Sequence, residues 1–398
     1  MAGEHTGRKQ SIGIGKESTA GTAVSASAWL PKISGAFTPK SEVAEDQGAY
    51  GIIDSVKEVQ TVKNWTEVQF SAVARDVYMG HILTALFGTT YNTVRFPVSS
   101  VSGTFSSGET ITESTSTATG TLRRIDVSGS TPMLYIVPVA GTFTGGQTLT
   151  GGTSSATATG GTIIGPSAGR NHIFQRLNTN LHPTYTLYGS DPVSDDRAVY
   201  CMLDNLEFEC VVGDYAKFTA LFKGRQLAST SAQTPSYTTQ TPFLAKHASL
   251  KTASAYSGLD AASALSVERV MLRFPKNLDM FYDFGETNAD TIMNQDFGPI
   301  SGEITLLYNA VTQRDYVINS TKQSMRLRIE NTAATAVAGS SYPAIQFDFS
   351  SVGFREFSRT TENGGIVKQT LQFVAEYDAT TRSNTCEAIL QNTQTTAY

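Results

Sequence analysis

The sequence predicts a mainly β fold of two tandem domains, and three observations support this class. Most segments of the 398-residue chain alternate apolar and polar residues with a period of two, which is typical of half-buried strands. Hydrophobic residues form 40% of the chain, enough for a sizeable core, and the length suits two or three domains. The order of strand, helix and hairpin found in the first half recurs in the second half.

The first predicted domain begins with a strand at Ile33–Phe37, and a long polar segment, Thr38–Asn64, follows it. The next strand, Trp65–Ala74, has one apolar and one polar face, so it separates a core from water. Its apolar side chains are Val68, Phe70 and Ala72, and its polar side chains are Glu67, Gln69 and Ser71.

A helix and a hairpin complete this domain. Asp76 is the expected N-cap of a helix that runs to about Phe87, and Gly88 is suited to end that helix. A strand at Thr184–Tyr188 precedes a hairpin whose two alternating runs flank the turn Gly213-Asp214. These runs are Leu206–Cys210, with Glu207 and Glu209 on its polar face, and Ala216–Phe222.

The second predicted domain repeats this order after a Ser-, Thr-, Gln- and Pro-rich linker at 228–245. A strand at Val270–Phe274 precedes a second long polar segment, Pro275–Pro299. The later elements are a strand at Glu303–Tyr308, a helix within Val311–Thr321, a strand at Met325–Ile329, and a hairpin of Ile345–Phe349 and Val367–Ala375. Both hairpins end in similar sequences, Lys217-Phe-Thr-Ala-Leu-Phe222 and Lys368-Gln-Thr-Leu-Gln-Phe373. Tandem duplication explains this match, although any two β domains of this size would alternate in a similar way.

The block from Phe96 to Gly165 is predicted to be an inserted module of the first domain. Residues between Val101 and Thr112 recur 38 positions later, between Val139 and Thr150. The block is rich in Gly, Ser and Thr and poor in charge, which favours a small exposed β structure, with a flexible loop as the alternative. The domain boundaries are therefore 1–95 with 166–227, 96–165 for the insert, and 246–398. We expect the insert to lie outward, as a module that assembly of the chain does not require.

Composition excludes several classes of protein. A net charge of -5 and a pI near 5.6 argue against general binding of nucleic acid, because phosphate binding needs clustered Lys and Arg. No secretion signal opens the sequence and no apolar run approaches the roughly 20 residues that span a bilayer, so we expect synthesis in the cytoplasm. Three cysteines without metal-ligand spacing, Cys201, Cys210 and Cys386, are expected to be buried free thiols.

No motif for catalysis or cofactor binding is present. Gly13-Ile-Gly15-Lys16 lacks the earlier glycine of a phosphate-binding loop, because position 10 is Gln10. The five histidines show no zinc-binding spacing, and no serine lies in a Gly-x-Ser-x-Gly turn. We therefore expect neither enzyme activity nor a cofactor.

Several segments resemble the tail tube (major tail) protein family of siphophages, the phages with long, non-contractile tails. These segments are Ile12–Val24, Trp29–Lys32, Trp65–Glu67, Leu83–Gly88, Asn205–Cys210 and Ile366–Tyr377. Each is short and degenerate, but their order spans most of the chain apart from the insert. In that family, β-sandwich domains with a flanking helix close into rings, the ring sheets join into a β-barrel, and stacked rings form the tube through which DNA passes.

The resemblance implies a structural protein of the phage tail, assembled in the host cytoplasm, with no membrane contact. Its partners would be copies of itself, the tail terminator, tape measure and distal tail proteins, and DNA that passes without specific binding. Because the chain carries two predicted tube domains, three chains would build a ring that single-domain relatives build from six, and hexameric rings are the alternative.

The same resemblance assigns two sets of site residues. The polar strand faces are expected to line the lumen, because a conduit for DNA must be acidic or neutral. These residues are Glu67, Gln69, Ser71, Glu207, Glu209, Glu303, Thr305, Gln346 and Asp348. The two long polar segments are expected to make contacts between rings. These residues are Glu42, Glu45, Asp46, Tyr50, Asp54, Lys57, Asp283, Glu286, Asp290 and Asp296.

Two other functions fit a β-rich chain. A virion decoration or adhesion protein would also be rich in Thr and Gly, but would more often lack two matched domains. A carbohydrate-active enzyme would need paired carboxylates in a concave site, which could be built across subunits.

Overall fold

The computed structural model describes residues 7–48, 50–51, 53, 58–163, 171–337, 341–360, 365–380 and 382–398. The predicted β class is confirmed, because strands hold 55% of the residues and the two α-helices and short 3-10 turns hold 7%. The 3-10 turns are Gly7–Lys9, Ala245–His247 and Tyr256–Gly258. Cys201, Cys210 and Cys386 are free and buried, as predicted.

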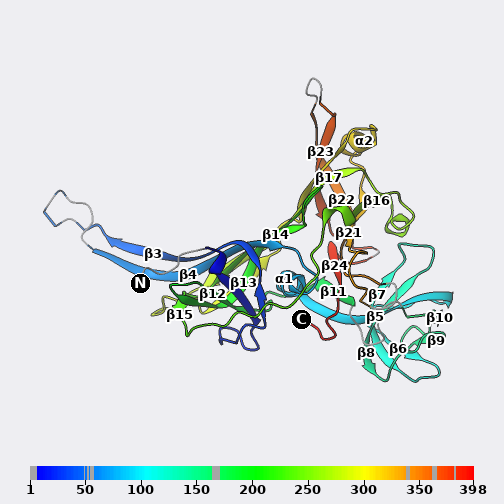
Figure 1. Cartoon of the computed structure of the whole chain (residues 1–398), viewed down its shortest axis with the longest axis horizontal. Helices are drawn as coiled ribbons and strands as arrows, with labels where there is room; N and C mark the ends of the chain where they lie inside the picture. The colour runs from blue at the N-terminus through cyan, green and yellow to red at the C-terminus, as the bar shows by residue number, and fades with distance from the viewer. Residues whose placement is uncertain are drawn as a thin grey trace.

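Eight antiparallel strands form one continuous sheet that crosses the predicted domain boundary (Figure 1). The first four in spatial order are β3 (Lys32–Asp46), β4 (Glu58–Val73), β14 (Lys217–Gly224) and β13 (Asp195–Val211). The next four are β17 (Val267–Pro275), β20 (Ser301–Leu307), β23 (Lys368–Glu376) and β22 (Ala344–Thr360). The pairing of β13 with β17 joins the two groups.

Shorter strands close the other side of the core. The amino-terminal half of β13 pairs with β12 (Tyr185–Ser190), and that of β22 pairs with β21 (Gln323–Glu330). Apart from a small hairpin described below, the other strands outside the insert are β1 (Ser11–Lys16), β2 (Ala28–Leu30), β11 (Asn171–Arg176), β12, β15 (Ala228–Ser229), β16 (Ala248–Ala253), β21 and β24 (Cys386–Gln391). One hydrophobic cluster holds buried residues from both halves of the chain, so the two strand groups share a core.

The first helix forms close to where the sequence predicts it. Helix α1 (Tyr78–Phe87) is almost wholly buried and ends at Gly88, whose φ of 86° is the left-handed value that glycine adopts without strain. Asp76 is not its N-cap, because its Oδ1 accepts a hydrogen bond from Thr241 N at 2.8 Å and so holds the linker instead. The second helix, α2 (Thr312–Ile318), is shorter than its predicted segment and buries no residue fully.

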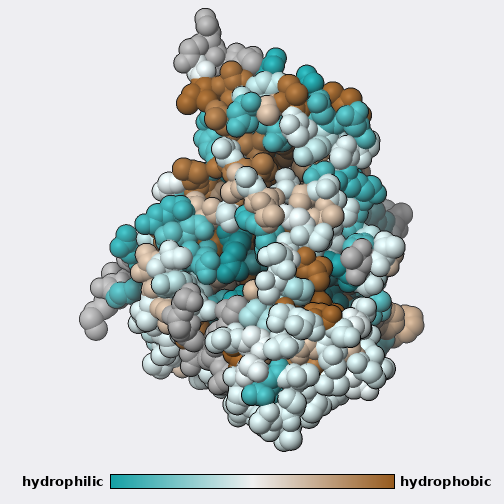
Figure 2. Space-filling view, turned by 90° about the vertical axis from the view of Figure 1, so that its right-hand side faces the viewer, coloured by the Kyte–Doolittle hydropathy of each residue, from teal (hydrophilic) through white to brown (hydrophobic). Residues whose placement is uncertain are grey.

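The insert folds as a closed six-stranded barrel with a hydrophobic core of its own. Its strands are the far part of β5 (Gly88–Ser102) with β6 (Thr110–Glu113), β7 (Thr119–Asp126), β8 (Met133–Ala140), β9 (Thr148–Gly151) and β10 (Thr157–Gly160). The predicted start at Phe96 falls inside β5, which pairs with β11 before it enters the barrel. The surface of the barrel is mostly pale in Figure 2, as its Gly, Ser and Thr residues imply.

The 38-residue repeat gives the barrel an internal twofold character. Gly103 and Gly141 both have positive φ, and each lies against an alanine of the other repeat. A Cβ on Gly103 would come within 3.1 Å of Ala156, and one on Gly141 within 2.9 Å of Ala118. The repeated glycines are therefore required by close approach of backbone as well as by turn geometry.

The first long polar segment is a regular hairpin. Strands β3 and β4 stay paired out to Asp46 opposite Glu58. They project as an arm from the body, which is the name used here for the strands and helices outside the barrel (Figure 1, blue, left). The second segment forms a smaller hairpin of β18 (Asn277–Phe281) and β19 (Thr291–Asp296). Asn64 N donates to Thr287 O at 2.7 Å, so the second hairpin contacts the root of the arm.

Candidate functional site

Seven of the nine residues predicted to line a lumen lie on one face of the eight-stranded sheet. They are Glu67, Gln69, Ser71, Glu207, Glu209, Glu303 and Thr305, and all are exposed or half-buried. The strand register places Ser71 opposite Thr219, Thr219 opposite Glu207, and Glu207 opposite Arg273 in a single row across four strands. The neighbouring residues along each strand face the core on the other side.

Basic side chains balance the acidic ones on this polar face. Arg269 bridges two strands, because its Nε lies 2.7 Å from Glu209 Oε1 and its Nη1 lies 2.9 Å from Glu303 Oε1. Arg273 lies 3.5 Å from Glu207 in the same way. These groups are about a quarter to a half exposed, so each pair is worth little to stability. The face is therefore closer to neutral than to acidic.

The prediction was wrong for Gln346 and Asp348. Both belong to the amino-terminal half of β22, where Ala344–Ser350 are buried on both sides of the strand. Asp348 has no exposed surface and Gln346 is 4% exposed, so neither can lie on an open face. A pattern of alternation assigns a residue to a face of a strand, but it does not report whether another part of the chain covers that face.

The Asp348 carboxylate is the centre of a buried charge cluster that joins the barrel to the body. It accepts hydrogen bonds from Arg326 Nε at 2.6 Å, from Arg124 Nη2 at 2.5 Å and from Tyr256 Oη at 2.9 Å. The second guanidinium nitrogen of Arg124 lies 3.0 Å from Glu387. Burial by itself would raise the pKa of Asp348, but the two arginines outweigh it and hold that pKa below its usual range.

This cluster shows that the insert is anchored to the rest of the chain by buried ion pairs, while the expectation that assembly does not require it stays a prediction. Arg124 belongs to β7 of the barrel, whereas Asp348 and Glu387 belong to β22 and β24 of the body. Deleting the barrel would remove Arg124 from two buried carboxylates, which is costly because they would lose a counter-charge inside the protein.

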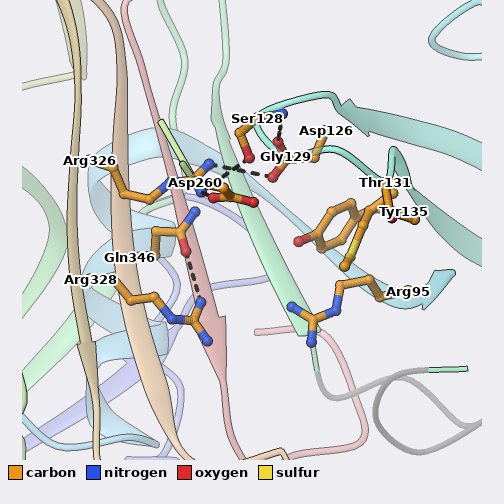
Figure 3. A pocket seen from close by; sticks show the side chains of 11 residues that line it. Arg95, Asp126, Ser128, Gly129, Thr131, Tyr135, Asp260, Arg326, Arg328 and Gln346 are labelled. Carbon is orange, nitrogen blue, oxygen red and sulfur yellow. Dashed lines mark hydrogen bonds and ion pairs between the residues drawn. The ribbon is translucent and has the colours of Figure 1, made fainter. Parts of the chain in front are cut away.

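A polar cavity of about 230 Å³ lies beside the cluster, between barrel and body (Figure 3). In Figure 3 the guanidinium groups of Arg95, from β5, and Arg328, from β21, face one another across it. The two carboxylates in its lining, Asp126 and Asp260, are both ion-paired with Arg326. This lining differs from a glycosidase site, in which two carboxylates are held ready for proton transfer and nucleophilic attack.

The residues predicted to contact other rings are gathered on the two hairpins. Glu42, Glu45 and Asp46 are exposed on the arm, and Tyr50, near its tip, donates a hydrogen bond to Asp46. Asp54 and Lys57 lie outside the described residues. Asp283, Glu286, Asp290 and Asp296 are exposed on the β18–β19 hairpin. Whether either hairpin touches another chain stays a prediction.

The long sheet has two open edges. In the described strand pairings, β3 pairs with β4 alone. The carboxyl-terminal half of β22 pairs with β23 alone, since β21 and β24 pair with the other half. Such edges expose unpaired backbone N–H and C=O groups, which can recruit a strand of another chain.

The two four-strand groups match in pairing order and in register. Phe208 of β13 pairs with Phe218, and Arg359 of β22, 151 positions later, pairs with Gln369. Both pairings shift register at corresponding places, between Leu203 and Asn205 and between Phe354 and Glu356. The pairings of β3 with β4 and of β17 with β20 likewise shift at corresponding places, after Lys32 and after Val267. Strand β3 therefore corresponds to β17, and β22 to β13.

Comparison with known proteins does not identify the chain. A scan against protein-family models found no match, and a search of curated proteins found none either. In the described part of the chain, neither helix has the length and apolarity to cross a membrane. The same residues include no group of three or more His, Cys, Asp or Glu side chains arranged to hold a metal ion.

Proposed function

We propose that this protein is the tail tube protein of a siphophage, which closes into rings through its sheet edges and stacks those rings into the conduit for DNA. The observation that carries the proposal is the joint between β13 and β17, read together with the two open edges. Inside the chain, β13 of the first group pairs with β17 of the second. By the correspondence above, β22 is the counterpart of β13, and β3 is the counterpart of β17. The open edge of β22 in one copy can therefore pair with β3 of another copy in the way that β13 pairs with β17 inside the chain.

A joint of this kind is head-to-tail, so repeating it generates a closed ring or an open helix. Closure into a barrel removes both edges, which explains how a chain with two long open edges can stay soluble once assembled. Each chain supplies two matching four-strand groups, and three chains would supply six. We therefore favour trimeric rings with pseudo-sixfold symmetry.

The polar face suits the inside of such a barrel. Its acidic and basic side chains are paired with each other, so few charges are left to bind phosphate. The arm of β3 and β4 projects beyond the body and presents exposed acidic residues, which supports a role for it in stacking one ring on the next.

Electron cryo-microscopy of the purified full-length chain tests the proposal. We expect rings or tubes with three chains per ring and with the polar face of the eight-stranded sheet toward the channel. Six chains per ring would contradict the trimeric ring. A protein that stays monomeric at high concentration would contradict the proposal that the chain forms a tube. Turnover of a glycan by such a monomer would favour the carbohydrate-active alternative.

A charge change on the polar face tests the lumen assignment. Replacing Glu67, Glu207 and Glu303 together with lysine should leave the tubes intact, because half-exposed ion pairs contribute only about 0–1 kcal/mol each. DNA ejection should slow at low salt and recover as salt rises, because the added lysines bind phosphate by releasing counterions.

The matched control replaces the same three residues with glutamine. This variant loses the same ion pairs but gains no positive charge, so it should eject DNA like the parent. If the lysine variant assembles and ejects DNA at the parent rate in low salt, the polar face does not line the channel.

A further inference from the structure

The cavity at the β3 edge and the cavity at the internal joint have matching walls. About 230 Å³ of space at the edge is bounded by Ile12 and Gly189, which pair with each other, and by Lys32 and Gly35 of β3. At the joint a space of only about 60 Å³ has corresponding walls. They are Leu250 and Leu327, which also pair with each other, and Val267 and Val270 of β17.

The two cavities differ in what closes them. At the joint, Cys210 of β13 and Val212 just after it complete the wall, so the space is nearly filled. At the β3 edge the described strand pairings place no second strand, and the cavity is larger and also lined by Asp191 and Asp196. The joint within a chain is permanent, so its walls can be almost wholly apolar, whereas an edge that meets water before assembly is better served by carboxylates such as those of Asp191 and Asp196.

One contact across the joint locates the partner of Asp196. Phe208 of β13 packs on Phe347 of β22, with ring centroids 5.2 Å apart and both side chains buried. By the correspondence of β13 with β22, Phe208 is matched by Arg359. Leu327 in the wall of the joint cavity takes the place of Gly189 in the wall of the edge cavity. Since Leu327 pairs with Phe347 and Gly189 pairs with Asp196, Asp196 takes the place of Phe347.

We propose that the β3-edge cavity receives the carboxyl-terminal half of β22 from a second copy of the chain, and that Arg359 of that copy pairs with Asp196. This inference rests on the proposed ring. The ion pair between Arg359 and Asp196 of two chains would thus occupy the position that the Phe208–Phe347 contact occupies at the joint within one chain. The same register places Glu356 opposite Lys40 on the polar face, which adds a second complementary pair.

The isolated chain leaves both groups ready for this contact. Arg359 is exposed, its guanidinium lies 5.3 Å from the ring centroid of Tyr308, and it has no acidic partner within 4 Å among the described residues. Asp196 is half-buried, and among the described residues its carboxylate accepts only a long hydrogen bond of 3.3 Å, from Ser194 Oγ. Both side chains lie on the core side of their strands, since Arg359 pairs with the buried Gln369 and Asp196 lines the cavity.

A charge swap tests the pair in the full-length protein. Arg359→Glu and Asp196→Arg should each lower the fraction of chain in rings or tubes by about tenfold or more, because like charges are then juxtaposed at the contact. The double variant restores opposite charges and should assemble to within about threefold of the parent. Sedimentation and electron microscopy measure the assembled fraction, and circular dichroism of the monomers checks that each variant is folded.

Arg355→Glu is the matched control. Arg355 lies on the same strand and is exposed, but it corresponds to Asp204, whose carboxylate pairs with Lys223 on the polar face. This variant should assemble like the parent.

The outcomes distinguish a failure of the proposed Arg359–Asp196 ion pair from a failure of the proposed ring. Rings that form in the parent but are unaffected by either single substitution, or a double variant no better than the singles, would overturn the Arg359–Asp196 pair and leave the tube standing. A parent that forms no rings would overturn both.

Discussion

Replacing Asp348 with alanine is expected to lower the free energy of unfolding by about 3–5 kcal/mol, because two buried arginines would lose their shared carboxylate. The side chains of Arg124 and Arg326 are 2% and 8% exposed, so bulk water reaches them poorly once the carboxylate is lost. Urea unfolding at neutral pH, followed by circular dichroism, measures the change.

The effect should also depend on pH with a definite sign. The pKa of Asp348 is depressed in the folded protein, so its stabilising contribution is fully present above the ordinary carboxyl value of 3.8 and is lost as the pH falls below it. The difference between parent and variant should therefore be constant from neutral pH down to about pH 5 and shrink in stronger acid.

Asp260→Asn provides the control for Asp348. Asp260 also pairs with Arg326, but its side chain is 51% exposed, so the loss should stay within about 1 kcal/mol. If the Asp348 and Asp260 variants unfolded at the same urea concentration, the buried cluster would contribute no more than a surface ion pair.

The alternation of apolar and polar residues predicted which face each strand of the long sheet turns to the core. Phe70 on β4, Phe208 on β13 and Ile304 on β20 all lie on the core side, as their spacing implies. Helix α1 and its end at Gly88 were also predictable, because a buried helix and a left-handed terminator both leave local signals.

The arm and the charge cluster were not predictable, for two different reasons. Both faces of β3 from Thr38 to Asp46 are exposed, so no apolar period marks this stretch as a strand. Asp348 alternates with Phe347 and Phe349 as a surface residue would, and its partner Arg124 is 224 positions away in the chain. No local pattern indicates that the inserted barrel folds back on β22.

A second buried charge should make stability rise with pH. Lys276 is 4% exposed; its Nζ donates to Ala85 O at 2.7 Å, near the end of α1, and lies 3.0 Å from His182 Nδ1. Burial first, and then the nearby Arg176, lowers the pKa of Lys276 from 10.5 to about 7, although Asp204 acts in the opposite direction.

The sign follows from the protons bound in each state. Between about pH 7 and 10.5 the unfolded chain keeps the Lys276 proton and the folded chain does not, so the parent should gain stability as the pH rises. The full gain is on the order of 3–5 kcal/mol, and it is absent below pH 7, where the folded protein holds a buried ammonium group.

Lys276→Met removes this titration while keeping an unbranched side chain of similar length. Its free energy of unfolding should exceed that of the parent near pH 7, and this advantage should shrink as the pH rises because the parent gains stability. The unpaired Ala85 carbonyl lowers the value of the variant by about 1–3 kcal/mol at every pH, so near pH 10 the variant should fall below the parent. Lys246→Met is the control, because Lys246 is exposed and its loss should leave the slope unchanged. Urea unfolding at intervals from pH 6 to 10 measures the three slopes. Parallel curves for the parent and Lys276→Met would show that Lys276 stays protonated in the folded protein, held by the α1 carbonyl and by Asp204 despite its burial.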